Sequence, residues 1–199
     1  MSSSPVLLYT EQTPNPESLK FVTNRMLFAN NNADFREENL AKEWSPIGTA
    51  LFAKPYVKGV YVCNNFVTVT KEFNYEWSDI MIEVKQFIKE YVEGGGEIIK
   101  EGFTEWRKST EKKEDNTYSG DDVDVVQKIR DLIDTYVKPA VESDGGNIEF
   151  KSYHAGVVEV ILQGSCSGCP SSTVTLKSGI EGMLKRMVPQ VTEVIAEAG

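Results

Sequence analysis

The chain has 199 residues, a net charge of −9 and a sequence pI near 4.8. This acidity argues against a nucleic-acid partner and against a membrane-surface partner, because both are themselves anionic. The composition, 40% hydrophobic and 26% charged, is typical of a globular protein, and the length fits one large domain or two small ones. No run of residues approaches the roughly 18 apolar positions that a membrane-spanning helix needs.

The first hundred residues predict a compact α+β domain. The segment Thr13–Phe21 contains two prolines, which keep the residues before them extended and prevent a helix. We interpret this segment as a rigid loop between two strands, with a loop that contacts a partner protein as the alternative. The apolar patterning and turn residues around it predict strands at Val6–Tyr9, from Phe21, at Val60–Cys63 and at Phe66–Thr70, and helices beginning at Ser45 and running from Trp77 to Tyr91.

A composition change separates the two halves of the chain. Residues 102–119 are rich in Glu, Lys, Ser and Thr and contain almost no aliphatic side chains, so they offer little surface to bury. We therefore expect a flexible charged linker at 101–120, in which Trp106 and Tyr118 pack locally. The linker would join a domain at 1–100, which contacts partners or clients, to a second domain at 121–199.

The second half also predicts an α+β fold. A helical period begins at Asp121 and runs to Val141, and Pro139 should kink or restart this helix. The expected domain is a three-stranded sheet with helices on one face. Its remaining elements are strands at Ile148–Tyr153 and Val157–Gln163 joined at Ala155-Gly156, a helix at Thr173–Met187 and a last strand at Val191–Ile195.

Two of the three cysteines, Cys166 and Cys169, form a close pair between a predicted strand and a predicted helix. The positive end of the helix dipole would favour thiolates there. Small residues let the backbone curl so that both sulfurs point the same way; they are Ser165, Ser167 and Gly168. The pattern predicts an anionic metal–sulfur centre.

The number of ligands decides what kind of metal centre is feasible. Zinc and iron–sulfur centres take about four protein ligands, whereas this chain clusters only two, and His154 falls in a predicted hairpin turn. Two chains related by a two-fold axis would supply four thiolates, enough for a 4Fe-4S cluster at the subunit seam. A zinc-bridged dimer is an alternative with the same ligand count.

A thiol–disulfide oxidoreductase is the other alternative for two cysteines at this spacing. Such a dithiol usually follows the first strand of a βαβ unit, whereas Cys166 follows the second strand of a predicted antiparallel hairpin. Pro170 also follows the pair instead of separating it, and its position excludes the haem-attachment pattern, which needs His there. We therefore favour metal binding over redox chemistry.

The third cysteine and the amino terminus bear on the compartment. Cys63 falls in a predicted strand, where a buried structural thiol is expected. Three cysteines with one close pair do not form a secreted disulfide framework. The segment Met1–Pro5 has neither a signal-peptide nor a transit-peptide pattern. A reducing cytoplasm, most simply a bacterial one, is the expectation.

Two sets of motifs resemble the Nfu family. The run Asp144–Ile148, followed by Gly164–Thr173 and Gly179–Glu181, resembles its NifU-like C-terminal domain. In the first half, Thr13–Pro16 with Ser18–Phe21 is similar to the Nfu amino-terminal domain, as are later segments; these are Ser45-Pro46, Gly59-Val60 and Phe66–Thr70. The resemblance covers nearly all of the chain except the expected linker.

The resemblance implies an iron–sulfur cluster scaffold or carrier and not an enzyme. Such a protein holds a 4Fe-4S cluster between two protomers, with a 2Fe-2S form as a further option. It implies Cys166 and Cys169 as the ligands, a homodimer when loaded, and a loop shaped by Ser165, Ser167 and Gly168. Upstream cluster-assembly proteins and apo iron–sulfur clients would be the partners, and the amino-terminal domain would choose among them.

Overall fold

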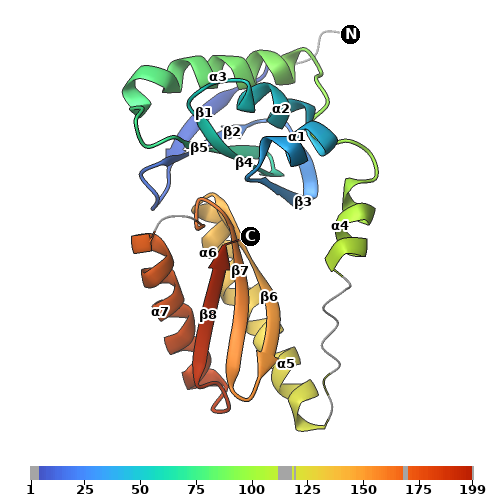
Figure 1. Cartoon of the computed structure of the whole chain (residues 1–199), viewed down its shortest axis with the longest axis vertical. Coiled ribbons are helices and arrows are strands. Elements are labelled where there is room, and N and C mark those ends of the chain that lie inside the picture. The colour runs from blue at the N-terminus through green and yellow to red at the C-terminus, as the bar shows by residue number, and fades with distance from the viewer. Residues whose placement is uncertain (1–4, 112–117, 119, 168–169, 199) are drawn as a thin grey trace. The chain divides into compact units, whose positions relative to one another are not determined.

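The computed structural model describes residues 5–111, 118, 120–167 and 170–198 (Figure 1). Helices and sheets both occur, which confirms the predicted α+β class. The chain divides into two compact units, Met1–Glu111 and Lys112–Gly199. Within the described residues, none of the helices combines the length and apolar character that crossing a membrane requires.

The amino-terminal unit is a five-stranded antiparallel sheet in the order β1-β2-β5-β4-β3. Its strands are β1 (Leu8–Gln12), β2 (Ser18–Thr23), β3 (Phe28–Phe35), β4 (Val57–Asn64) and β5 (Phe66–Lys71). Its helices are α1 (Glu38–Trp44), α2 (Pro46–Phe52), α3 (Trp77–Glu93) and α4 (Phe103–Glu111).

Buried apolar side chains that alternate along the strands, and others that share one face of α3, form the core of this unit. Alternate residues of β2, β4 and β5 pack with Ile80, Val84 and Ile88, which recur every four residues and so share one face of α3. The helix expected at Ser45 is confirmed, because the Ser45 hydroxyl accepts the Gly48 N–H at 3.0 Å as an N-cap. Asn64-Asn65 at the junction of β4 and β5 suits a hairpin turn that needs positive φ, and Asn64 has a φ of 44°.

The helix α4 corrects the expected linker over Phe103–Glu111. Phe103 is only 4% exposed, and its ring centroid lies 5.8 Å from that of Phe35 and 5.9 Å from that of Trp44. Trp106 packs on Trp44 with 5.2 Å between centroids, and Arg107 donates to the Asn32 carbonyl on the edge strand β3 at 3.0 Å. These aromatic side chains bury enough area to order a segment that has few aliphatic residues. The first unit therefore extends past residue 100, and residues 112–117 and 119 of the expected linker lie outside the described part.

The carboxy-terminal unit has a three-stranded sheet, as predicted, in the order β6-β7-β8. Its strands are β6 (Gly146–His154), β7 (Val157–Gly164) and β8 (Glu193–Ala198). Its helical segments are α5 (Asp121–Leu132), the π-helical turn η2 (Ile133–Val137), α6 (Lys138–Ser143) and α7 (Pro170–Met187). The π turn immediately precedes Pro139, whose missing N–H cannot continue an α-helical ladder, so the expected helix interruption is confirmed.

One core joins the helices to a single face of this sheet. Val158, Val160 and Leu162 of β7 are fully buried and alternate with partly exposed residues, so they share the covered face. Ile129 of α5 and Leu184 of α7 belong to the same hydrophobic cluster. The expectation that helices cover one face is therefore confirmed.

The parallel pairing of β8 corrects the predicted topology around Cys166, on which the argument against a redox dithiol depended. β8 pairs with β7 in parallel, with Val158 opposite Val194, so β7, α7 and β8 form a βαβ crossover. The cysteine loop thus follows the first strand of a crossover as well as the second strand of a hairpin. The topological objection to a redox dithiol therefore does not hold.

Phe103→Ala should destabilise the amino-terminal unit by about 3 kcal/mol, because it empties a buried aromatic site. The matched control is Phe73→Ala, which removes a phenylalanine that is 78% exposed and should cost less than about 0.5 kcal/mol. All three tryptophans lie in this unit, so denaturant unfolding of the whole chain followed by tryptophan fluorescence reports on it alone. Equal effects of the two substitutions would show that α4 is not part of the folded unit.

Candidate functional site

The loop between β7 and α7 holds the cysteine pair. Cys166 lies two residues after the end of β7 and is 6% exposed. Cys169, with Gly168, lies outside the described residues, so its predicted role as a ligand stays a prediction. The side chains at the start of α7 are also outside the description.

The cysteine loop packs on a turn that precedes it by about twenty residues. The β6–β7 pairing places Gly146 opposite Gly164, which brings the turn Asp144-Gly145 beside Ser165. The Ser165 N–H donates to the Gly145 carbonyl at 3.2 Å, and its hydroxyl donates to the Asp144 carbonyl at 2.5 Å. These contacts join two separate sequence motifs into one structural site.

Glycine at position 146 leaves room for the Cys166 sulfur. A Cβ atom added to Gly146 would lie 2.9 Å from Cys166 Sγ and 2.5 Å from the Gln163 carbonyl oxygen. Real side chains do not pack at such distances, so any larger residue would displace the sulfur or the strand. Gly145 and Gly164 have positive φ values of 82° and 64°, the left-handed conformation that glycine adopts without strain.

Burial raises the pKa of the Cys166 thiol above its ordinary value. The Ser165 hydroxyl acts in the opposite direction, because it can donate a hydrogen bond to the thiolate once the proton is lost, and the nearby Asp144 carboxylate raises the pKa further. The expectation that the helix dipole favours a thiolate is therefore wrong for Cys166 in the cluster-free chain, because desolvation outweighs it.

A buried polar network lies beside the Gly146–Gly164 pair, at the same end of the β6–β7 hairpin as the cysteine loop. Asn147 is fully buried, and its Nδ2 donates to Gln163 Oε1 at 2.8 Å and to Glu149 Oε1 at 3.0 Å. Its Oδ1 has no hydrogen-bond partner within the described part of the chain. The sequence motif contained Asn147, but only the cross-strand register shows that it supports the strand that carries Cys166.

The structure does not bring His154 to the cysteines. His154 pairs with Val157 at one end of the β6–β7 hairpin, whereas Gly146 and Gly164 pair at the other, about 26 Å away for eight residues of strand. It is exposed and precedes Ala155, whose positive φ of 47° marks the turn. His154 is thus the last residue of β6 and flanks the turn instead of lying in it as predicted, and its distance from Cys166 agrees with a surface residue and not with a ligand.

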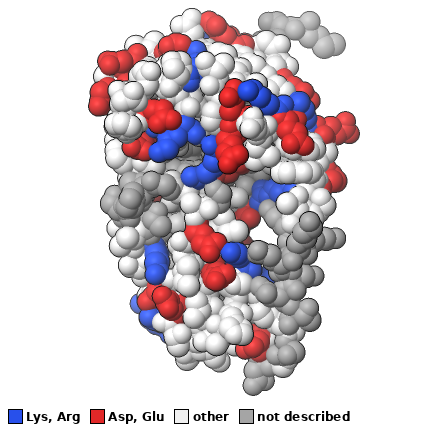
Figure 2. Space-filling view, in the orientation of Figure 1, with Lys and Arg blue, Asp and Glu red and all other residues white. Residues whose placement is uncertain are grey.

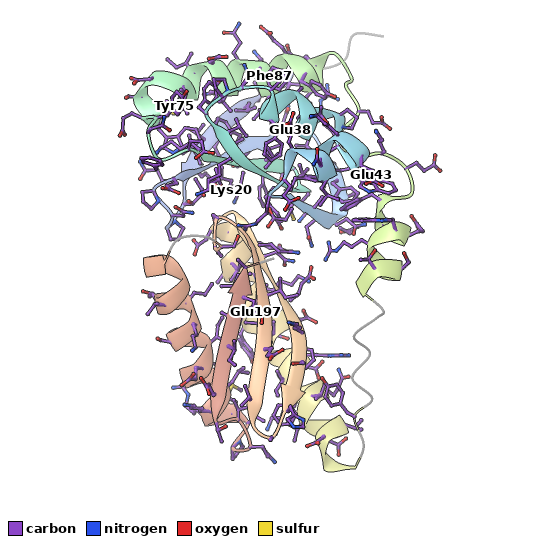
Figure 3. The ribbon with its side chains drawn as sticks, in the orientation of Figure 1. Lys20, Glu38, Glu43, Tyr75, Phe87 and Glu197 are labelled. Carbon is purple, nitrogen blue, oxygen red and sulfur yellow. The ribbon has the colours of Figure 1, made fainter. Side chains whose placement is uncertain are left out.

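Other donors within the described residues do not gather into a metal site. No group of three or more His, Cys, Asp or Glu side chains is found there. On the carboxy-terminal sheet, Lys151 pairs with Glu197 of β8 at 2.8 Å and with Glu159 at 3.8 Å; Glu197 is labelled in Figure 3. Acidic and basic side chains are interspersed on the face that Figure 2 shows.

Cys63 belongs to the amino-terminal unit and is 3% exposed on β4. It packs in a small apolar cluster with Val22, Tyr61 and Phe66. The expected burial is confirmed, and this packing agrees with a structural thiol.

Two family models match the chain. Residues 8–95 match the model described as "Scaffold protein Nfu/NifU N terminal", and residues 129–195 match the NifU-like domain. The solution NMR structure of a NifU-like protein from Saccharomyces cerevisiae aligns at a TM-score of 0.45 with 24% identity, covering 51% of this chain and 91% of the other.

Curated relatives align with nearly the whole chain. The protein named "NFU1 iron-sulfur cluster scaffold homolog, mitochondrial" from Drosophila sechellia is 38% identical over 190 residues, which cover 95% of this chain and 64% of the relative. The protein of the same name from Drosophila grimshawi is 39% identical over 188 residues, covering 94% and 60%. The chain thus spans less than two thirds of the length of these relatives.

These relatives correct the expected compartment. They are named as mitochondrial proteins, which contradicts the expectation of a bacterial cytoplasm. The expectation was drawn from the cysteine usage and from the absence of a targeting pattern at Met1–Pro5, and neither identifies a compartment.

The motifs around Cys166 and the two domain matches indicate the same family. With a Nfu/NifU amino-terminal domain at 8–95 and a NifU-like domain at 129–195, the chain belongs to the Nfu family of iron–sulfur cluster scaffold proteins.

Proposed function

We propose that this chain is a non-enzymatic carrier that holds a 4Fe-4S cluster between two protomers and transfers it to apo-proteins. The cluster is cargo, bound by Cys166 and Cys169 of each protomer. The observation that carries the proposal is the position of Cys166 directly after β7, in a loop that hydrogen bonds hold against the Asp144–Gly146 turn. Two thiolates per chain satisfy a four-ligand cluster only when two chains combine.

The site's chemistry suits reversible loading. A thiol must lose its proton to ligate iron, so loading releases protons, and the raised pKa of Cys166 makes this cost larger than for an ordinary cysteine. We infer that client thiolates replace the cysteines one at a time, and that the seam between protomers opens as the cluster leaves.

A thiol–disulfide oxidoreductase is the less favoured alternative. The βαβ crossover is compatible with it, but a nucleophilic cysteine needs an accessible thiolate, which is promoted by a lowered pKa. Cys166 has the opposite properties, since it is buried and its pKa is raised. A zinc-bridged dimer uses the same ligands and is distinguished by the colour and metal content of the purified protein.

Alkylation of Cys166 in the cluster-free chain should rise with pH, with a midpoint above the value of about 8.5 for an ordinary thiol. The raised pKa keeps Cys166 protonated near neutrality, and raising the pH through the pKa generates the reactive thiolate. Iodoacetamide labelling of a Cys63→Ser, Cys169→Ser chain, followed by mass spectrometry, measures this profile. A midpoint near neutral pH, together with insulin reduction by the unmodified chain, would favour the oxidoreductase.

Anaerobic reconstitution with iron and sulfide should give about four irons and four sulfides for every two chains, the ligand count of a shared cluster. Cys166→Ala and Cys169→Ala should each abolish uptake, because either leaves only two thiolates in the dimer. Cys63→Ala is the control and should retain it. Iron and sulfide assays with zinc analysis on the same samples make the measurement; one zinc per two chains without iron uptake would establish the zinc-bridged dimer instead.

The amino-terminal unit is proposed to select clients or donors. Removing residues 1–111, which end with α4, should leave cluster binding intact and slow delivery to some clients, because the recruiting surface is lost while the ligands stay. Activation of several apo-proteins by the loaded full chain and by the loaded residues 112–199 makes the comparison. Equal rates for every client would contradict the selecting role.

A further inference from the structure

Two buried serines of the cysteine loop have different hydrogen-bond partners. Ser165 is 1% exposed and Ser167 is 3% exposed, so each hydroxyl needs a partner inside the protein. The Ser167 hydroxyl donates to the Gly164 carbonyl at 3.0 Å, three residues earlier in the same loop. The Ser165 hydroxyl instead reaches out of the loop, to the carbonyl of Asp144.

The Ser165 bonds clamp the loop onto the Asp144–Gly146 turn. The hydroxyl bond to Asp144 and the backbone bond to Gly145 act on neighbouring carbonyls, so the loop is held at two points. Ser167 makes no such link across the sequence, because both its hydroxyl and its N–H bond to Gly164. Of the two serines, Ser165 is therefore the one that ties the position of Cys166 to the turn before β6.

The same hydroxyl contacts the sulfur of its neighbour. Ser165 Oγ lies 3.7 Å from Cys166 Sγ, within the range of hydrogen bonds to sulfur. A hydroxyl has one proton, and that of Ser165 is directed to the Asp144 carbonyl, which can only accept. While the thiol is protonated, the Ser165 oxygen is therefore the acceptor in this contact and the Cys166 S–H is the donor. Once the thiol ionises, the hydroxyl can turn its proton to the thiolate, so Ser165 contacts the sulfur in both states.

Gly146 also lies against the sulfur. A Cβ atom added to Gly146 would come within 2.9 Å of Cys166 Sγ, so the sulfur packs directly on the Gly146 backbone. The hydroxyl of Ser165 and the backbone of Gly146 together make a seat for the thiol.

We propose that Ser165 is a positioning residue that holds the Cys166 thiol in this seat in the cluster-free chain. The inference rests on the proposed function, because Cys166 matters as a cluster ligand. The seat keeps the sulfur at a defined site and sheltered from reagents until cluster or client arrives. Ser165 acts through Cys166 and is not itself a ligand.

The test compares Ser165→Ala with Ser167→Ala in a Cys63→Ser, Cys169→Ser chain, where Cys166 is the only thiol. Both substitutions remove one buried hydroxyl, so both should lower the stability of the chain to a similar extent. Iodoacetamide labelling is measured at the alkaline plateau of the pH profile, where differences in rate report exposure of the sulfur and not its ionisation.

Ser165→Ala should label at least about five-fold faster than the parent chain, whereas Ser167→Ala should stay within about two-fold, since a rate factor of five corresponds to about 1 kcal/mol of lost protection. Ser165→Thr keeps the hydroxyl and should restore much of the slow rate. Equal labelling of Ser165→Ala and Ser167→Ala would overturn the proposal, because loss of a buried hydroxyl would then have no specific effect at the sulfur.

A measurement that does not depend on any Ser165 variant provides a second test. The Raman S–H stretching band of the single-cysteine chain should have the lowered frequency of a thiol that donates a hydrogen bond. A band typical of a thiol without a hydrogen bond would overturn the proposal even if Ser165→Ala failed to fold. Failure of iron uptake by the unmodified chain would refute the proposed carrier function, while the labelling and Raman results would still decide the role of Ser165.

Discussion

The pairing of Gly146 with Gly164 is the contact on which the candidate site depends. It brings a turn at the start of β6 against the loop at the end of β7, and the absence of a side chain at Gly146 gives the Cys166 sulfur its place. A register slip of one residue would turn these positions to the other face of the sheet. The hydrophobic alternation of β7 fixes the register, because Val158, Val160 and Leu162 must face the helices.

Local sequence patterns were sufficient to predict those features of the fold that depend on residues within a single helix or turn. The stripe on α3, the cap at Ser45 and the turn at Ala155-Gly156 followed from spacing, capping and turn chemistry, which act between near neighbours. The cysteine spacing and the motifs around it similarly indicated the family before any geometry was considered.

Non-local packing explains what the sequence patterns missed. The helix α4 is rich in charged and polar residues, and it is ordered because Phe103 and Trp106 meet aromatic rings from β3 and α1. The parallel direction of β8 depends on how α7 crosses the sheet, which alternation along one strand cannot report. At the site, the sequence indicated Cys166, but its burial and raised pKa depend on the turn at Asp144, some twenty residues away.

The central claim is that one cluster is shared by two chains through Cys166 and Cys169. Native mass spectrometry of the anaerobically reconstituted protein tests it most directly, because the intact complex reports chain number and cluster content together. The account predicts a species of two chains with one 4Fe-4S cluster, which separates into cluster-free single chains when the cluster is removed. A single chain that carries a complete cluster would contradict it. A two-chain species whose mass shows no bound iron or sulfide would contradict it as well.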